Sequence, residues 1–245
     1  LPISSVSQKT KYISSTPSRN RVINIYPFYN KHLFFTDNFI SDENGNLFAP
    51  NYCNKHVSYY SKNDVLISNC SESYLFSLVE KKTISVLYSG RSIVNLVKRD
   101  KKIFIATPTQ LLYKKNLKEK FKPISLEPNI QIKVTLLAED TKSRLWVGTE
   151  GWGLYVLDEN QTIIKALNKN NILESDNIKS LFIDSTNKVW IGTDKGIMLL
   201  TENEEGEFKT SKPFSDLDLK NNIISSIYSY RDTVYFATSN EFLAC

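Results

Sequence analysis

The sequence predicts an all-β protein built from repeated four-stranded antiparallel units, and three observations support this prediction. The stretch "LWVGTEGWGLYVL" that starts at Leu145 returns as "VWIGTDKGIMLL" from Val189, 44 positions later. Short runs rich in β-branched and aromatic residues alternate with polar clusters of Asp, Asn, Lys, Ser and Gly, which is the signal of strands and turns. With 41% hydrophobic and 12% aromatic residues, the chain has the composition of a folded globular protein.

The clearer copy of the repeat predicts its strands in order. We expect strands over residues 134–138, 145–149 and 154–157, and a fourth strand that starts at Thr162. A tight loop over residues 150–153 joins the second strand to the third. Four antiparallel strands in roughly 44 residues are typical of one blade of a β-propeller, whereas β-sandwiches show no such self-similarity.

Positions that recur in both copies predict shared structural tasks. The recurring pairs, each 44 positions apart, are Asp140 and Asp184, Trp146 and Trp190, Gly148 and Gly192, and Thr149 and Thr193. We expect the aspartates to form turns by bonding the backbone ahead of them, and the tryptophans to fill the wedge between neighbouring blades. The glycines should allow close approach of the next blade, and the threonines should bond backbone at the start of the hairpin loop.

Weaker copies flank the two clear ones. The residues that take the place of the tryptophan in these copies are Phe34, Leu66, Phe104 and Tyr235. Blades are therefore expected over residues 21–55, 56–90, 91–130, 131–176 and 177–221, with a partial blade over 222–245 and an N-terminal segment over 1–20 that could complete a blade.

The length of the chain predicts about five to six blades at roughly 43 residues each. These blades form either a compact six-blade ring or a piece of a seven-bladed or tandem propeller. The piece is favoured, because an open propeller needs further blades to cover two exposed sheet edges.

The repeat pattern itself resembles a known family. The pattern D-x-x-x-x-x-W-[IV]-G-T-x-x-G-[IL], preceded in the second copy by "LESDNIKSL", resembles the two-component regulator propeller repeat. That repeat occurs in extracytoplasmic sensor domains of hybrid two-component systems. The family usually has a glycine two positions before the tryptophan, where this chain has Arg144 and Lys188. This difference concerns the turn and not the fold.

The resemblance implies an extracytoplasmic ligand-binding sensor region of a two-component system. Such a region would sense an oligosaccharide and signal to a histidine kinase elsewhere in the full-length protein, so the region itself would not be an enzyme. The implied partners are a small-molecule or oligosaccharide ligand and the remaining propeller and kinase parts of the same protein, and a homodimer is compatible with this arrangement. The implied location is periplasmic, with a tether to the inner membrane through the rest of the protein.

The candidate ligand site lies where the two copies differ. The first copy has "TEGWG" where the second has "TDKG", so Trp152 is an extra aromatic residue at a loop tip. Exposed aromatic residues on loops are candidates for ligand contact, although this side chain could instead fold back onto its own blade. In a four-stranded blade the loops between second and third strands share one face with the connectors between blades. On that loop face we expect Trp152, Glu150, Asp194 and Lys195 to bind the ligand.

The sequence carries little that predicts catalysis. Its two histidines, His32 and His56, lie in no catalytic motif, and no residue is assigned a catalytic or metal-binding role or a cofactor. Two alternatives to a sensor stay open: a structural or protein-interaction propeller, such as a secretion-system accessory, and an enzyme similar to the streptogramin lyases, whose repeats share a D-x-x-G-x-W character. The lysine-rich stretch from Tyr113 and the acidic stretch from Glu202 are both expected to be solvated surface.

The charge and hydrophobicity of the chain exclude two classes of binding partner. The net charge of +5 comes from dispersed lysines offset by 26 acidic residues, so we expect no nucleic-acid partner, which would need a concentrated basic face. No apolar run is long enough to span a membrane, so we expect no membrane insertion by this region.

The first residue is Leu, which suggests that an upstream segment such as a secretory leader was removed. Free buried thiols are favoured for Cys53, Cys70 and Cys245, with a bridge between the first two as the alternative.

Overall fold

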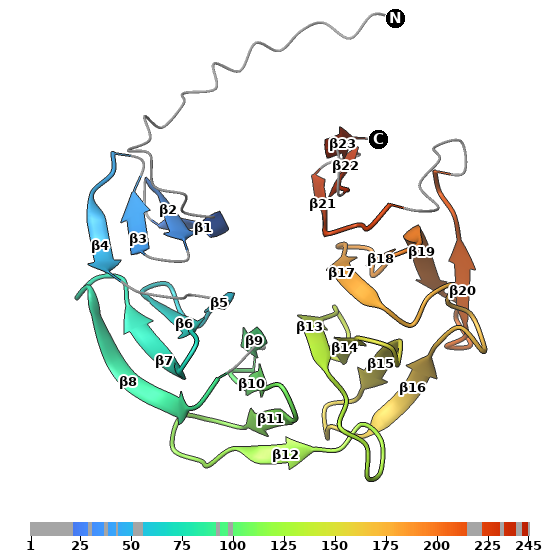
Figure 1. Cartoon of the computed structure of the whole chain (residues 1–245), viewed down its shortest axis with the longest axis horizontal. Helices are drawn as coiled ribbons and strands as arrows, with labels where there is room; N and C mark the ends of the chain where they lie inside the picture. Colours follow the sequence, from blue (N-terminus) through green and yellow to red (C-terminus); the bar gives the residue numbers. More distant parts are fainter. Residues whose placement is uncertain are drawn as a thin grey trace, which may run out of the picture.

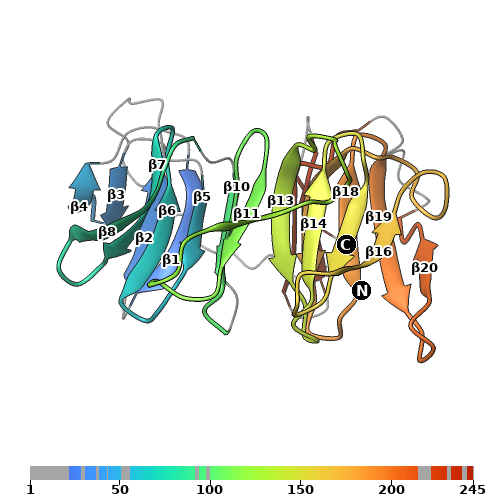
Figure 2. The same cartoon turned by 90° about the horizontal axis from the view of Figure 1, so that it is seen from below.

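The computed structural model describes residues 22–28, 31–36, 39–42, 44–50, 56–91, 94–97, 100–214, 222–230, 233–238 and 242–244. Over these residues the regular structure is all β, in six antiparallel sheets that follow one another in sequence order. Figure 1 shows the sheets arranged around an arc, and in the first five sheets the first strand lies nearest the centre and the last at the periphery. Seen from below, the sheets stand side by side as blades (Figure 2). The predicted all-β propeller architecture is confirmed.

The blades are made of the following strands. The first holds β1 (Val22–Phe28), β2 (Lys31–Thr36), β3 (Phe39–Asp42) and β4 (Leu47–Pro50), and the second holds β5 (His56–Tyr59), β6 (Asp64–Ser68), β7 (Glu72–Ser77) and β8 (Lys82–Ser89). The third holds β9 (Val94–Val97), β10 (Ile103–Ala106), β11 (Leu111–Lys114) and β12 (Lys122–Ile124). The fourth holds β13 (Val134–Glu139), β14 (Leu145–Thr149), β15 (Leu154–Leu157) and β16 (Ile163–Leu167). The fifth holds β17 (Ile178–Ile183), β18 (Val189–Thr193), β19 (Gly196–Glu202) and β20 (Phe208–Ser211), and the sixth holds β21 (Ser226–Tyr230), β22 (Thr233–Ala237) and β23 (Phe242–Ala244).

The predicted strands of the fourth blade agree with β13 to β16 to within one residue at each boundary that was predicted. The four residues predicted to replace the tryptophan in weaker copies all lie on the second strand of their blades: Phe34 on β2, Leu66 on β6, Phe104 on β10 and Tyr235 on β22. Leu66 and Phe104 pack against the next blade as the tryptophans do. The prediction for Phe34 is wrong by one position, because Leu33 and Phe35 are the residues buried against the second blade and successive side chains of a strand point to opposite faces.

The two repeated tryptophans fill the wedges between blades, as predicted. Trp146 is fully buried in a cluster that includes Ile178 and Ile191 of the fifth blade, and its ring meets that of Phe208 edge to face at 5.5 Å. Trp190 packs in a cluster with Phe236 of the sixth blade. Burial of these large rings is a main source of cohesion between neighbouring blades.

The repeated glycines lie where the next blade comes closest. A Cβ atom on Gly148 would lie 3.0 Å from Ile178, and one on Gly192 would lie 2.8 Å from Ile224, in each case a residue of the following blade. Neither glycine has a positive φ, so space and not backbone conformation requires glycine here. The predicted close approach is confirmed.

The repeated aspartates form the turns between first and second strands, as predicted. Oδ1 of Asp140 accepts hydrogen bonds from the backbone N–H groups of Lys142 and Arg144, and Oδ1 of Asp184 accepts the equivalent bonds. The left-handed residue of each turn is Ser143 or Asn187, at φ of 60° and 66°. Because the positive φ falls one position earlier, the turn accepts a side chain at the position where related repeats have glycine.

The prediction that the acidic stretch from Glu202 and the lysine-rich stretch from Tyr113 are solvated surface is partly wrong. Glu202 has a side chain only 11% exposed, because both its oxygens accept hydrogen bonds of 2.8 Å from Arg144 of the preceding blade. In the lysine-rich stretch, Lys114 is 4% exposed, with its Nζ 5.0 Å from the centroid of the Phe121 ring. Burial lowers the pKa of Lys114. In each case a neighbouring group outside the local strand covers the charged side chain.

The cysteine prediction is also wrong for Cys70, which is exposed and disulfide-bonded. Cys53 and Cys245 lie outside the described residues. Structural disulfides persist in oxidising compartments, so the bond bears on where the protein works.

Candidate functional site

The loop face of the fourth and fifth blades gathers the predicted site residues around one connector. This connector, residues 168–177, joins β16 to β17. The carbonyl oxygen of Asp176 accepts hydrogen bonds from the N–H groups of Gly151 and Gly153 in the β14–β15 loop, at 3.0 and 2.9 Å. The connector also bonds the β18–β19 loop, as described below. The predicted sharing of one face by these loops and the connector is therefore confirmed for these blades.

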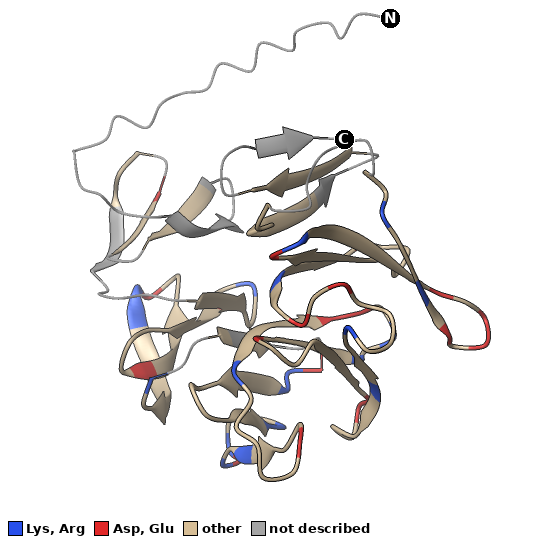
Figure 3. Ribbon diagram, turned by 45° about the vertical axis from the view of Figure 1, so that its right-hand side comes forward, with Lys and Arg blue, Asp and Glu red and all other residues tan. Residues whose placement is uncertain are grey.

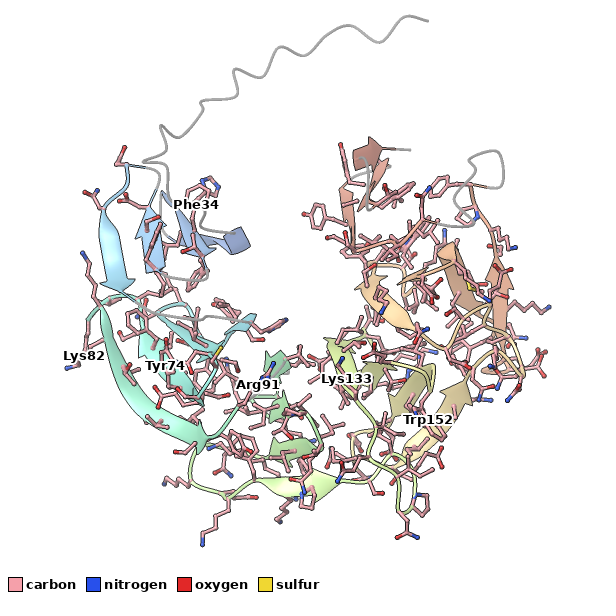
Figure 4. The ribbon with its side chains drawn as sticks, viewed as in Figure 1. Phe34, Tyr74, Lys82, Arg91, Lys133 and Trp152 are labelled. Atoms are coloured by element: carbon pink, nitrogen blue, oxygen red, sulfur yellow. The ribbon has the colours of Figure 1, made fainter. Side chains whose placement is uncertain are left out.

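Glu150 is held at the edge of this face by the connector that precedes β13. Its backbone N–H donates to the carbonyl of Lys133 at 3.0 Å, and its carboxylate forms an ion pair with the Lys133 ammonium. The hydrogen bond and charge of Lys133, with a smaller contribution from Lys179, lower the pKa of Glu150. Glu150 is thus an exposed, ionised acceptor. In Figure 4 the labelled Lys133 lies beside β13 toward the centre of the arc.

Asp194 is bound to the connector on its other side. Its carboxylate accepts hydrogen bonds from Ser175 Oγ and, at 2.9 Å, from Asn177 Nδ2. Burial by itself would raise the pKa of Asp194, but these hydrogen bonds and the charge of Lys179 lower it. The charge of Lys179 on β17 thus contributes, as the smallest of the causes, to the lowered pKa of both Glu150 and Asp194.

The remaining predicted residues, Trp152 and Lys195, are both exposed on their loops. Trp152 is 40% exposed at the tip of the β14–β15 loop, the position predicted for it. Lys195 donates its backbone N–H to Thr193 Oγ1 at 3.0 Å. Together the four residues supply this face with two ionised carboxylates, one ammonium group and one indole.

Sequence reasoning missed the residues that hold this surface together. Lys133 comes from the connector that precedes β13, where a single charged residue carries no motif. Ser175, Asn177 and Lys179 had a signal, because they belong to the "LESDNIKSL" segment that leads into β17 in the repeat. The repeat therefore specifies part of the site's scaffold as well as its blade.

A cavity of about 250 Å³ opens in the third blade, next to the same set of connectors. It lies between the β10–β11 loop, the end of β12 and the connector of residues 125–133. That connector ends at Lys133 and is also bonded to the fourth blade, because Tyr155 donates its hydroxyl hydrogen to Glu127 at 3.0 Å.

The structure also bears on features that catalysis, metal binding, nucleic-acid binding or membrane insertion would require. His32 lies on β2 and His56 starts β5, so the two histidines belong to different blades. Within the described ranges no cluster of three or more His, Cys, Asp or Glu side chains could hold a metal ion. Figure 3 shows basic and acidic residues interspersed over the described blades. In the part of the chain that the structure describes, no helix has the length and apolarity needed to cross a membrane.

Comparison with known proteins confirms the resemblance over one repeat. Residues 172–195 match a family model described as two component regulator propeller. This segment contains Ser175, Asp176, Asn177 and Asp194, and so most of the scaffold of the loop face. No curated protein matches the sequence of the whole chain.

Solved structures share the fold at low sequence identity. The extracellular domain of the hybrid two component system BT4673 from B. thetaiotaomicron is similar with a TM-score of 0.73 and 19% identity, over 95% of this chain and 34% of that one. The corresponding domain of BT3049 from the same organism gives 0.64 and 19%, over 91% and 33%. A virginiamycin B lyase from Staphylococcus aureus gives 0.57 and 12%, over 79% and 69%. The chain thus spans about a third of the length of the two extracellular domains.

Proposed function

We propose that this chain is part of the extracytoplasmic sensor region of a two-component system, which binds an oligosaccharide on the loop face of the fourth and fifth blades and signals to a histidine kinase elsewhere in the full-length protein. The observation that carries the proposal is the match to the two-component regulator propeller over residues 172–195. That segment supplies the connector to which the β14–β15 and β18–β19 loops are bonded.

The chemistry of the loop face suits a carbohydrate. Ionised Glu150 and Asp194 can accept hydrogen bonds from sugar hydroxyls, lysine ammonium groups can donate to ring and hydroxyl oxygens, and the exposed indole of Trp152 offers an apolar surface for a pyranose ring. The carboxylates and the ammonium groups of Lys133 and Lys179 oppose one another in charge. An uncharged sugar can therefore bind without leaving a charge unpaired.

The disulfide at Cys70 supports the proposed compartment. A structural disulfide is stable in the periplasm or outside the cell and is uncommon in the cytosol. Under this proposal the rest of the protein provides the tether to the inner membrane, and a signal passes only if the ligand binds two states of the assembly with different affinity.

The proposal is tested by thermal unfolding of the full-length protein and of this chain against a broad oligosaccharide panel. A cognate sugar at about 100 times its dissociation constant should stabilise the folded chain by about 2.7 kcal/mol. Trp152→Ala should remove most of this stabilisation, while Tyr59→Ala, which alters an aromatic residue 53% exposed in the second blade, should leave it intact. If no sugar moves the unfolding curve of the full-length protein, the sensing proposal is wrong. A catalytic activity that both His32→Ala and His56→Ala abolish would instead favour an enzyme.

A further inference from the structure

The cavity in the third blade has an apolar floor and a mouth that carries both polar side chains and the exposed Ile130. Its buried walls are aliphatic: Leu111 is 2%, Leu126 7% and Ile132 5% exposed. The exposed lining residues include Thr109 and Gln110. Side chains that are small, apolar and rigid below, with hydroxyl and amide groups above, are the usual lining of a site for a small organic ligand.

The mouth of this cavity is held in place by the repeat. Thr107, which aligns with Thr149 and Thr193, accepts hydrogen bonds at its hydroxyl from the N–H groups of Thr109 and Gln110, at 3.3 and 3.0 Å. Its own N–H donates to the carbonyl of Gln110 at 2.8 Å. The backbone under the two polar lining residues is therefore fixed before a ligand arrives, which lowers the entropic cost of binding.

The wall of the cavity lies next to the residue that anchors Glu150. Ile132 lines the cavity, and the next residue, Lys133, both accepts the backbone hydrogen bond of Glu150 and pairs with its carboxylate. Consecutive Cα atoms are about 3.8 Å apart, so the wall of the cavity and the anchor of the β14–β15 loop lie within one residue of each other.

The size and lining of the cavity select one chemical group. A volume of about 250 Å³ lies just below the range of roughly 300 to 1,000 Å³ typical of ligand pockets, so it suits a single sugar ring with a small substituent. An unsubstituted sugar would place hydroxyl groups against Leu111, Leu126 and Ile132, where they lose hydrogen bonds to water. An acetamido group places a methyl group there and offers its N–H and C=O to the Gln110 amide and the Thr109 hydroxyl.

We propose that this cavity is an acetamido subsite, so that the oligosaccharide sensed by this protein contains an N-acetylated amino sugar, with that sugar ring in the third blade and the rest of the oligosaccharide directed toward the β14–β15 loop. The inference rests on the proposed function, because it extends the same loop face toward the third blade. It identifies the substrate class, which the resemblance and the fold leave open.

The test measures dissociation constants by titration calorimetry for matched pairs of oligosaccharides that differ only by an N-acetylamino group in place of a hydroxyl. The full-length protein should bind one N-acetylated member at least about tenfold more tightly than its unsubstituted counterpart, the lower end of what one methyl-sized group is worth in an apolar pocket. Ile130→Ala, at a lining residue that is 45% exposed, and Gln110→Trp, which should fill the mouth, should both bring the ratio of the two dissociation constants close to one, because each removes contacts that the acetamido group would make. Ile164→Ala is the matched control, because Ile164 is 43% exposed on β16.

Each other result overturns the inference in a distinguishable way. Equal binding of both members of every pair removes the acetamido subsite and leaves the sensing proposal standing. Loss of affinity for both members in Ile130→Ala assigns that residue a general contact and also contradicts an acetamido subsite. If neither member of any pair binds, the proposed function and the subsite both fail.

Discussion

The indole N–H of Trp146 donates a 2.8 Å hydrogen bond to Oδ2 of Asp140, six residues earlier in the chain. Trp190 and Asp184 form the same pair at 3.4 Å. The aspartate that closes the turn between first and second strands therefore also fixes the ring that fills the wedge to the next blade. One recurring carboxylate couples local turn geometry to the packing between blades.

This relationship predicts different costs for three similar aspartates. Asp140→Ala should lower the free energy of unfolding by about 3 to 5 kcal/mol. Asp140 is 1% exposed, so its loss leaves the Nε–H of Arg144 and the indole N–H of Trp146 without an acceptor, at about 1 to 3 kcal/mol each, and removes the turn bonds, worth about 1 kcal/mol. Asp184→Ala should cost less, since its bond to the indole is longer. The matched control is Asp158→Ala: Asp158 accepts the same two backbone bonds and should cost about 1 kcal/mol, as a lost cap does. Urea denaturation measures all three, and equal costs would contradict the indole's role.

Truncation of the buried Trp190 and of the exposed Trp152 should have different effects on the stability of the fold. Trp190→Ala should destabilise the fold by roughly 3 to 5 kcal/mol, because it empties the wedge between the fifth and sixth blades. Trp152→Ala, at a loop tip, should change stability by no more than about 0.5 kcal/mol. An unchanged unfolding midpoint for Trp190→Ala would show that this ring is not part of the core.

The close approach at Gly192 predicts a steric cost for a single methyl group. Gly192→Ala should destabilise the protein by about 1 to 3 kcal/mol, because the new Cβ would lie 2.1 Å from Ser180 Oγ and 2.8 Å from Ile224. Combining Gly192→Ala with Ser180→Ala removes the nearest obstacle. The cost of the double variant should therefore be smaller than the sum of the single costs, by about 0.5 kcal/mol or more. Strict additivity in chemical denaturation would argue against the contact.

The bridge between Arg144 and Glu202 predicts a dependence of stability on pH. Hydrogen bonds from Arg144 lower the pKa of Glu202 below its ordinary value of 4.5. A carboxylate with a lowered folded-state pKa stabilises the protein above its unfolded pKa, and this stabilisation is lost as pH falls through the folded pKa. Glu202→Gln should thus lower the free energy of unfolding at pH 7 and weaken its fall below about pH 4.5.

The control for this bridge is an exposed ion pair. Glu80 pairs with Lys82, and their side chains are 58% and 67% exposed, respectively. Glu80→Gln removes this ion pair and should change the free energy of unfolding at pH 7 by less than about 1 kcal/mol. Free energies of unfolding measured from pH 3 to pH 7 for both variants separate the two cases. If Glu202→Gln behaves like Glu80→Gln, the bridge between the fourth and fifth blades carries no stability.

The sequence by itself determined the strands, turns and recurring residues of the blade. Alternation of apolar residues, turn aspartates and the recurrence of Trp146 and Trp190 are local signals, because strands and turns depend mainly on residues within one repeat. For the same reason the boundaries of β13 to β16 and the roles of Gly148 and Gly192 could be predicted. The loop positions of Glu150, Trp152 and Asp194 followed from the antiparallel order of the strands.

Only the tertiary structure decided what those loops touch. The pairing of Glu150 with Lys133, the influence of Lys179 on two carboxylates and the burial of Glu202 against Arg144 join residues from different blades or connectors. Such contacts depend on how blades pack, and a charged residue in a single sequence carries no mark of the partner that will cover or pair it. The cavity has the same origin, since its floor and mouth come from β11, a hairpin loop and a connector that meet only in the folded chain.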